Sequence, residues 1–179
     1  MDASKNRILF VNDFTEKKGR QIVERMFELD AEDPKKDIVL VVSSYGGDVY
    51  ELMTIYDAMQ LVRCDVATLA LGKALSSGLL LLFCGTSGKR FITPNTTLLS
   101  HEMSVIAEGM LTDIKTEMKE NARQQKMVHN LFIKHTKIKE DELTKMNGRD
   151  MYITPKQALK YGMVDHIIST SAFWDKISL

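Results

Sequence analysis

The stretch Val66-Ala-Thr-Leu-Ala-Leu-Gly-Lys-Ala-Leu-Ser-Ser-Gly-Leu-Leu-Leu-Leu-Phe83 joins two apolar runs through a pair of serines. Its first run, residues 66–71, is typical of a buried strand, and its last, residues 79–83, of a buried helix. Ser76 and Ser77 therefore lie where a strand passes into a helix, beside backbone amides that favour negative charge. A serine at this place either caps the helix, which is the common role, or acts as a nucleophile whose oxyanion the amides stabilise.

Strand and helix patterns alternate on both sides of this stretch. Residues 37–42 are a β-branched run, which is typical of a strand covered on both faces. This run leads into Gly46-Gly47, where paired glycines allow positive φ and the close approach of another backbone. The remaining patterns predict helices over 15–29, 49–62 and 154–161 and strands over 7–11, 91–94, 97–101 and 163–168. This order predicts an α/β fold with crossover connections and helices packed on a sheet.

A long, highly charged helix is expected over about residues 111–134. A helix this polar is not a core element throughout its length. It either projects and packs on another copy of the chain or extends into solvent, and the pattern leaves both open. Its loose apolar stripe consists of Ile114, Met118, Ala122, Met127, Leu131 and Phe132.

The composition excludes several classes of function. Lys+Arg and Asp+Glu balance at 24 each, which gives no electrostatic case for nucleic acid or an anionic membrane as a partner. Cys64 and Cys84 lie in apolar surroundings without metal-ligand spacing, which indicates buried, reduced thiols in a cytoplasmic protein. The N-terminal residues lack a signal pattern, and no apolar run reaches membrane-spanning length. Because no repeat or linker is visible, we expect a single domain over residues 1–179.

Four histidines are candidates for a catalytic base, and the pattern alone does not choose among them. His101 follows an apolar strand and His166 lies in the last strand, whereas His129 and His135 lie on or near the charged helix and are expected to be solvated. Asp150 is an acid at the start of a hydrophobic segment. The order Ser, His, Asp is compatible with a catalytic triad, because triads are defined by geometry rather than chain order. Taken singly, each of these residues is more often structural than catalytic.

Several blocks form one ordered pattern along the chain: Ser44-Tyr45-Gly46-Gly47, Ile55-Tyr56-Asp57-Ala58-Met59-Gln60, Gly72-Lys73-Ala74-Leu75-Ser76-Ser77-Gly78, Gly88-Lys89-Arg90-Phe91-Ile92-Thr93-Pro94-Asn95, Leu99-Ser100-His101, Arg149-Asp150 and Ala158-Leu159-Lys160-Tyr161-Gly162-Met163-Val164-Asp165. Taken together, they resemble the proteolytic subunit of the Clp protease, the ClpP family. The resemblance runs from about Arg7 to Ile168. From the glycine pair to Asp165 it aligns with little or no gapping, including the distances from Ser to His and from His to Asp.

Carried over residue by residue, the resemblance implies a set of catalytic groups. The family's nucleophile falls on Ser76, its base on His101 and its orienting acid on Asp150. Its oxyanion donors fall on the backbone amides of Gly47 and Ser77. The implied reaction is peptide-bond hydrolysis through an acyl-enzyme, with no metal and no cofactor. Ser77 is an alternative nucleophile, but the register of the flanking blocks favours Ser76.

The same resemblance implies a fold and an assembly. The fold is a ClpP/crotonase-type α/β spiral of strand–strand–helix units, with helix 111–134 as a protruding handle. The implied assembly is a homo-oligomer of heptameric rings stacked in pairs, which encloses the sites and takes protein or peptide substrates. In this family the triad depends on ring-to-ring contacts.

This chain departs from the family pattern near the implied site. Tyr45 replaces a proline before the glycine pair, and Ser77 replaces the methionine after the nucleophile. Only the backbone of residue 77 is required, so we expect activity to survive. Glu102-Met103 replaces Gln-Pro, and the Gly-rich substrate-pairing strand reads Val105-Ile106-Ala107-Glu108-Gly109. Cleavage preference is therefore expected to differ.

Further departures concern partners and origin. Val39 and Val41 stand where the family offers aromatic residues to its ATPase, and Thr93 lies close to Phe91. These residues argue against docking of an AAA+ unfoldase in the usual clefts. Most of the family's N-terminal pore loop and first helix have no counterpart here, a shortened form that would suit a phage-encoded or otherwise divergent member.

Two rival functions remain beside the peptidase. One is a non-catalytic ClpP-like subunit that serves only in assembly, against which the intact Ser, His and Asp positions argue. The other is a crotonase-type acyl-CoA enzyme, which shares the fold and the paired-amide oxyanion site. That class would place carboxylates near the amides rather than this Ser, His and Asp set.

Overall fold

The structure is a computed structural model that describes residues 6–146 and 149–179. Its elements are β1 (Ile8–Val11), α1 (Glu16–Glu32), β2 (Ile38–Ser44), α2 (Val49–Leu61), β3 (Val66–Leu75), α3 (Ser77–Phe83), β4 (Arg90–Ile92), β5 (Thr97–Ser100), α4 (Leu111–His135), α5 (Glu140–Met146), β6 (Met151–Ile153), α6 (Pro155–Lys160), β7 (His166–Ile167) and η2 (Ser171–Lys176). The α/β fold expected from the sequence is confirmed.

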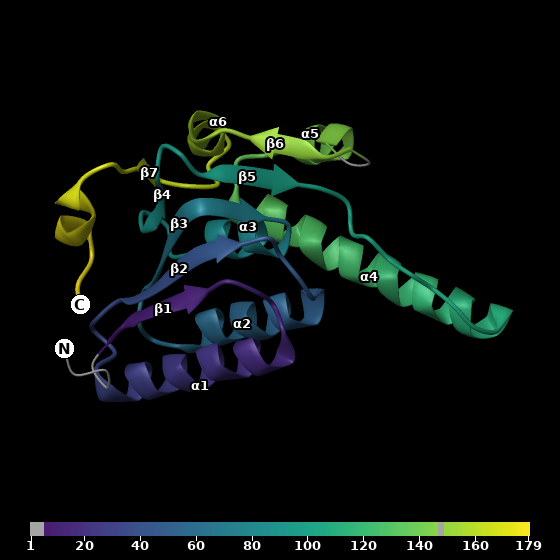
Figure 1. Cartoon of the computed structure of the whole chain (residues 1–179), viewed down its shortest axis with the longest axis horizontal. Helices are drawn as coiled ribbons and strands as arrows, with labels where there is room; N and C mark the ends of the chain where they lie inside the picture. Colours follow the sequence, from purple (N-terminus) through teal and green to yellow (C-terminus); the bar gives the residue numbers. More distant parts are fainter. Residues whose placement is uncertain (1–5, 147–148) are drawn as a thin grey trace.

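One seven-stranded sheet organises these elements (Figure 1). Strands β1, β2, β3, β4 and β7 follow one another in that order and all neighbours are parallel. Strand β5 also pairs in parallel with β3, and β6 pairs antiparallel with β5. The carboxyl ends of β2, β3 and β5 therefore meet at one edge of the sheet, where β6 begins.

Strand β3 is longer than the sequence pattern indicated. The expected strand ended at Leu71, but the observed strand continues to Leu75. Gly72, at φ 72°, separates the two halves, and each half has its own partner. Residues 68–70 pair with β4, and residues 73–75 pair with β5. The Gly-Lys pair at 72–73 interrupts the apolar run, so the sequence pattern indicated neither the continuation of the strand nor its change of partner.

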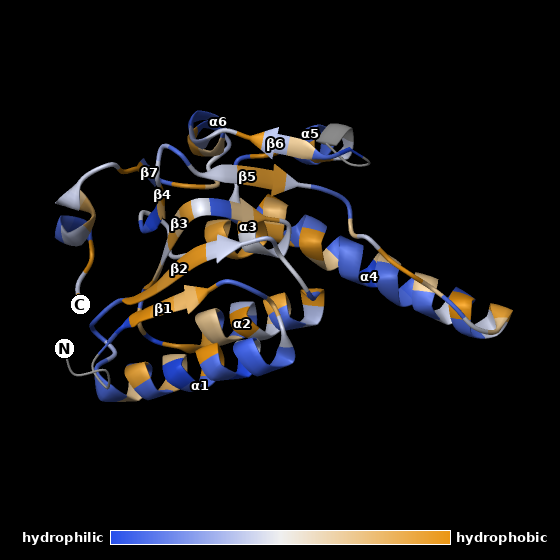
Figure 2. Cartoon of the chain, viewed as in Figure 1, coloured by the Kyte–Doolittle hydropathy of each residue, from blue (hydrophilic) through white to orange (hydrophobic). Residues whose placement is uncertain are grey.

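The two faces of the sheet carry apolar clusters of different size. Hydrophobic residues recur along the central strands β2 and β3 (Figure 2). Helices α1, α2 and α3 cover one face with side chains such as Met26, Leu52 and Leu81, all fully buried. The opposite face carries a smaller cluster, made of Val39, Val41, Ala67, Leu69, Phe91 and Phe173. Phe173 belongs to η2, so the C-terminal segment covers part of this second face.

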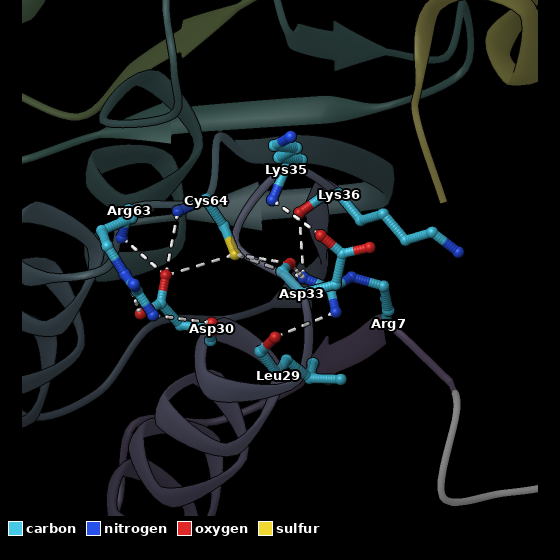
Figure 3. A network of polar contacts seen from close by, with 8 residues as sticks. All are labelled: Arg7, Leu29, Asp30, Asp33, Lys35, Lys36, Arg63 and Cys64. Carbon is cyan, nitrogen blue, oxygen red and sulfur yellow. Dashed lines mark hydrogen bonds and ion pairs between the residues drawn. The ribbon is translucent and has the colours of Figure 1, made fainter.

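A buried arginine fixes the start of the sheet (Figure 3). Arg7 is 6% exposed and precedes β1. Its guanidinium donates to the carbonyls of Leu29, Asp33, Lys36 and Asp37 at 2.9–3.1 Å, and it lies 3.2 Å from the Cys64 Sγ. Because these carbonyls lie in the last turn of α1 and in the segment that follows it, the bonds join the end of the helix to the first strand.

Helix α4 extends away from the body of the molecule (Figure 1). Its buried residues, Gln124, Val128, Leu131 and Phe132, all lie in its C-terminal half. Its N-terminal half is exposed, including Leu111 at 67% and Met118 at 49%. The protruding handle that the family resemblance implied is therefore present.

The C-terminal third differs most from the sequence pattern. The expected strand over 163–168 is reduced to His166–Ile167, and α5, β6 and η2 were not foreseen as regular elements. Helix α6 matches its signals, with a capping box from Thr154 and Gln157 and a positive φ at Gly162. Of the helices among the described residues, none combines the length and apolar character needed to cross a bilayer.

Candidate active site

Strand pairing brings the expected catalytic residues to one edge of the sheet. Ser76 follows β3, His101 follows β5, and Asp150 immediately precedes β6. The register pairs Leu75 with Leu99 and Ser100 with Met151. His101 is the residue after Ser100 and Asp150 the residue before Met151, so both lie just beyond the last pair of this register.

Ser76 has a strained backbone. Its φ of 53° and ψ of −125° make it the only residue other than glycine with positive φ among the described residues. Such conformations cost roughly 1–3 kcal/mol and cluster at functional sites. The backbone is held in place because the Ser76 amide donates to the Leu99 carbonyl at 2.9 Å, and the Ser76 carbonyl accepts from Leu79 and Leu80.

Neither serine of the pair caps helix α3. Ser76 occupies the N-cap position, but its side chain makes no capping hydrogen bond. The Ser77 hydroxyl instead donates to the Gly47 carbonyl at 2.9 Å. The capping interpretation of this stretch is therefore wrong, and the Ser76 hydroxyl is left free for other chemistry.

The glycine turn after β2 lies directly beside Ser76. A Cβ placed on Gly46 would approach the Ser76 Cβ to 2.7 Å and its Oγ to 3.2 Å. A Cβ on Gly47 would approach the Phe14 carbonyl oxygen to 2.9 Å. With φ values of 104° and 149°, both positions favour glycine. The Gly47 amide and the Ser77 amide, which has no acceptor within its helix, thus belong to adjoining turns at one edge of the sheet.

A small recess opens next to Ser76. Its volume is about 30 Å³, and both Ser76 and His101 line it. The remaining lining is mostly apolar and comes from α2, α3, α4 and the segment after β5: Val49, Leu79, Leu80, Met103, Val128 and Phe132. Sequence reasoning did not find this recess, because its walls come from four separate parts of the chain.

Ser76 and His101 line the same recess, whereas Asp150 is not among its lining residues. Ser76 is partly buried, whereas His101 and Asp150 are exposed. Within the described ranges, no hydrogen bond joins any two of these three side chains. Residues 101–110 form no helix or strand as they lead from β5 to α4, so His101 lies where the chain leaves the sheet. Catalytic hydrogen bonds are often long in unliganded enzymes and shorten on substrate binding.

The expectation that His135 is solvated is wrong. The His135 residue is partly buried, and its Nε2 lies 3.1 Å from the Tyr56 hydroxyl. The imidazole also packs edge-on against the Tyr56 ring. Burial, together with the charges of Lys134 and Arg90, lowers the pKa of His135 to about 4. His129 is also partly buried on α4 rather than solvated.

A second polar cluster lies around Arg90. Its guanidinium forms a bidentate pair with Asp165 at 2.6 and 2.9 Å and donates to the carbonyls of Phe83 and His135. Burial raises the pKa of Asp165, but the hydrogen bonds and charge of Arg90 outweigh it and hold that pKa below its usual value. Arg90 and Asp165 stood in two of the recognised sequence blocks, yet no spacing rule pairs residues so far apart. Among the described residues, no group of three or more His, Cys, Asp or Glu side chains could hold a metal ion.

Comparison with known proteins identifies the family. The family model for Clp protease matches residues 2–171. Two relatives from Dehalococcoides mccartyi, strains BAV1 and CBDB1, are each named ATP-dependent Clp protease proteolytic subunit. Each is 35% identical over 165 residues, which is 92% of this chain and 82% of the relative. The chain belongs to the Clp protease family.

Proposed function

We propose that this protein is a serine endopeptidase in which Ser76 is the nucleophile, His101 the base and Asp150 the acid that orients the base. The observation that carries the proposal is the strained Ser76 at the strand–helix junction, with His101 directly after the adjacent strand β5 and Asp150 directly before β6, which pairs with β5. Family membership supports the same reaction, since the relatives are named as proteolytic subunits.

The reaction begins when His101 removes the proton of the Ser76 hydroxyl as its oxygen attacks the peptide carbonyl. The carbonyl oxygen becomes negative and accepts hydrogen bonds from the amides of Gly47 and Ser77. One such donor contributes on the order of 3 kcal/mol to transition-state stabilisation. Asp150 holds the imidazole in the required tautomer and stabilises its protonated form.

Collapse of the tetrahedral intermediate breaks the carbon–nitrogen bond. The protonated His101 donates its proton to the leaving amine, and the substrate's acyl group remains as an ester on Ser76. Water then attacks this ester with His101 again as base, which releases the carboxylic acid and restores the Ser76 hydroxyl. Each proton taken up is returned, so the cycle needs no cofactor.

The recess beside Ser76 favours a small apolar side chain next to the cleaved bond. Its walls are aliphatic and aromatic, and its volume of about 30 Å³ is small. A charged side chain placed there would lose hydration without gaining a partner. We therefore expect cleavage after small apolar residues.

Assembly completes the proposed function. The exposed apolar residues Met110, Leu111 and Met118 on and before the projecting half of α4 suit contact with another copy of the chain. We propose a homo-oligomer of paired heptameric rings in the cytoplasm, in which such contacts draw His101 and Asp150 toward Ser76. The relatives' name includes ATP dependence. In this chain Val39 and Val41 are buried in a cluster with Phe173, which argues against their use as an exposed docking surface.

Labelling with a fluorophosphonate and hydrolysis of a fluorogenic peptide test the proposal, on a fraction whose mass in solution is measured. We expect the parent protein to be labelled and active, and Ser76→Ala to lose both properties at unchanged mass. Ser43→Ala, on β2, is the matched control and should retain both. Retained labelling of Ser76→Ala would refute the nucleophile assignment. An unlabelled, inactive parent of ring mass would favour the non-catalytic assembly subunit instead.

A further inference from the structure

The Ser77 side chain is a buried polar group at the proposed site and has no part in the reaction described above. Its residue is 1% exposed, and its hydroxyl donates to the Gly47 carbonyl at 2.9 Å. We propose that the Ser77 hydroxyl is a positioning group that fixes the distance between the two oxyanion amides. This inference rests on the proposed function. One residue would then supply one amide through its backbone and hold the other through its side chain.

The packing around Ser77 shows how the two turns are joined. Ser77 and Gly78 open helix α3, and a Cβ on Gly78 would approach the Ser44 Cβ to 3.3 Å, so the helix start already packs on the end of β2. Among the described residues, the Ser77 bond is the only side-chain hydrogen bond from α3 to the glycine turn. Its loss would leave that turn attached to the nucleophile's helix through packing alone.

On its other side, the glycine turn is held by the loop before α1. Gly47 forms a parallel bridge with Phe14, and the Asp48 amide donates to the Phe14 carbonyl at 3.1 Å. These bonds place the turn relative to the loop before α1, not relative to Ser76. Within the turn, the Gly46 amide donates to the Ser44 Oγ at 3.0 Å, but two adjacent glycines still have a wide range of backbone angles. A second anchor, on the Gly47–Asp48 peptide, limits the rotation about the Gly47 Cα that would move the Gly47 amide. Ser77 supplies that anchor from the side where the oxyanion forms.

The chemistry makes the distance between the amides important. An oxyanion donor acts when it lies about 2.7–3.1 Å from the position of the oxygen in the transition state. A small drift of the Gly47 amide weakens that hydrogen bond while leaving the binding of substrate side chains in place. The effect therefore appears in kcat rather than in KM.

Four variants of the full chain test the role of the hydroxyl. Ser77→Ala removes it, Ser77→Thr keeps it, and Ser77→Cys keeps a weak donor of similar volume. Ser43→Ala, which removes a hydroxyl from β2, is the control. The measurements are kcat and KM on a fluorogenic peptide and inhibition by a peptide aldehyde of the same sequence. The aldehyde forms a bond from its carbonyl carbon to the Ser76 oxygen, and its own oxygen, as an anion, occupies the amide pair. Thermal unfolding is recorded for each variant.

We expect Ser77→Ala to lower kcat about five- to tenfold, the effect of losing one hydrogen bond, with KM within about twofold. The aldehyde should bind more weakly by the same factor as kcat falls. Ser77→Thr should recover most of the loss and Ser77→Cys part of it. If the hydroxyl had only a structural role, Ser77→Ala would lower the unfolding temperature, and the ratio of the aldehyde's inhibition constant to KM would stay as in the parent.

Three results would overturn the inference. Parent-like kcat and aldehyde binding in Ser77→Ala would show that the hydroxyl positions nothing, while leaving the peptidase itself intact. A folded Ser77→Cys with activity no higher than Ser77→Ala, together with an inactive Ser77→Thr, would show that a hydrogen-bond donor at residue 77 does not support kcat. An inactive parent protein would reject both the peptidase and the positioning role, since no oxyanion would form.

Discussion

The polar groups around Ser76 and those around Arg90 belong to the same sheet, yet they differ in how completely they are bonded. Every nitrogen of the Arg90 side chain has an acceptor, in Asp165 or in the carbonyls of Phe83 and His135. In the other cluster, the side chains of Ser76, His101 and Asp150 make no hydrogen bond to one another. Buried polar groups with all partners stabilise one conformation, whereas groups that remain open are available to a substrate.

The two histidines of these clusters show the same difference. His135 is partly buried against Tyr56, and burial keeps its ring neutral. His101 is exposed at the end of β5 and lines the recess beside Ser76. The sequence offered both histidines as candidates for the catalytic base. The structure distinguishes them, because His135 is held by neighbouring groups and His101 is exposed. A histidine fixed by its neighbours is suited to structure, and one beside a free hydroxyl is suited to proton transfer.

The sharpest way to break this comparison is to replace each histidine by glutamine. His101→Gln should lower kcat/KM by on the order of 10⁴- to 10⁶-fold, because a triad loses nearly all of its rate enhancement with its base. His135→Gln should leave kcat/KM within a few-fold of the parent. Steady-state hydrolysis of a fluorogenic peptide measures both, with denaturant unfolding as the check on folding.

The comparison fails if the two variants exchange their effects. A folded, inactive His135→Gln beside an active His101→Gln would show that the fully bonded cluster carries the chemistry. Equal losses in both, at parent stability, would show that bonding does not separate the two roles.

Stability should respond in the opposite way. Arg90→Met leaves the carboxylate of Asp165 without its partner and two carbonyls without their donor, so we expect a loss of about 3–5 kcal/mol in the free energy of unfolding. Arg20→Met is a matched control, because Arg20 pairs with Glu24 on the exposed face of α1, with side chains 77% and 56% exposed. Because both side chains of this pair are exposed to solvent, its loss should leave the free energy of unfolding close to that of the parent.

Urea unfolding at neutral pH measures both arginine variants. A loss below about 1 kcal/mol in Arg90→Met would mean that the bidentate pair contributes little beyond its desolvation cost. The complete bonding of the Arg90 cluster would then not be what distinguishes it from the cluster around Ser76.

Much of this arrangement was predictable from the sequence. The apolar run before Ser76, the leucines after it and the glycine pair place a serine and two amides at adjacent strand ends, and the structure has them there. The handle helix was also foreseen, because its charge pattern extends over 25 residues. These features depend on local pattern, which a single sequence records.

Other features depend on contacts between distant segments. Strand β6 has three residues and exists because β5 offers it an edge, so Met151–Ile153 alone gave no strand pattern. The bonding of His135 depends on Tyr56, 79 residues earlier in the chain. The bond from Ser77 to Gly47 spans 30 residues and involves a carbonyl that every residue possesses. Nothing in the order of residues marks such partners before the chain is folded.

The smallest expected effect is the loss of folding stability at acidic pH that His135 causes. The folded-state pKa of His135, about 4, lies below the ordinary value near 6.5 because of burial and the facing charges of Lys134 and Arg90, with the Tyr56 hydroxyl as hydrogen-bond partner. Protonation therefore favours the unfolded chain. The stabilisation is fully present above about pH 6.5 and is lost as the pH falls from there toward 4. Because the ring is only partly buried, solvent screening reduces the effect to on the order of 1 kcal/mol.

Urea unfolding at pH 7.5 and pH 5, for the parent and for His135→Gln, measures this term. The parent should lose more stability than the variant between the two values, since glutamine does not titrate. An identical loss in both would show that His135 is as easily protonated in the folded chain as in the unfolded one. The second cluster would then be open to solvent in the way that the first one is, and the contrast between them would rest on Arg90 alone.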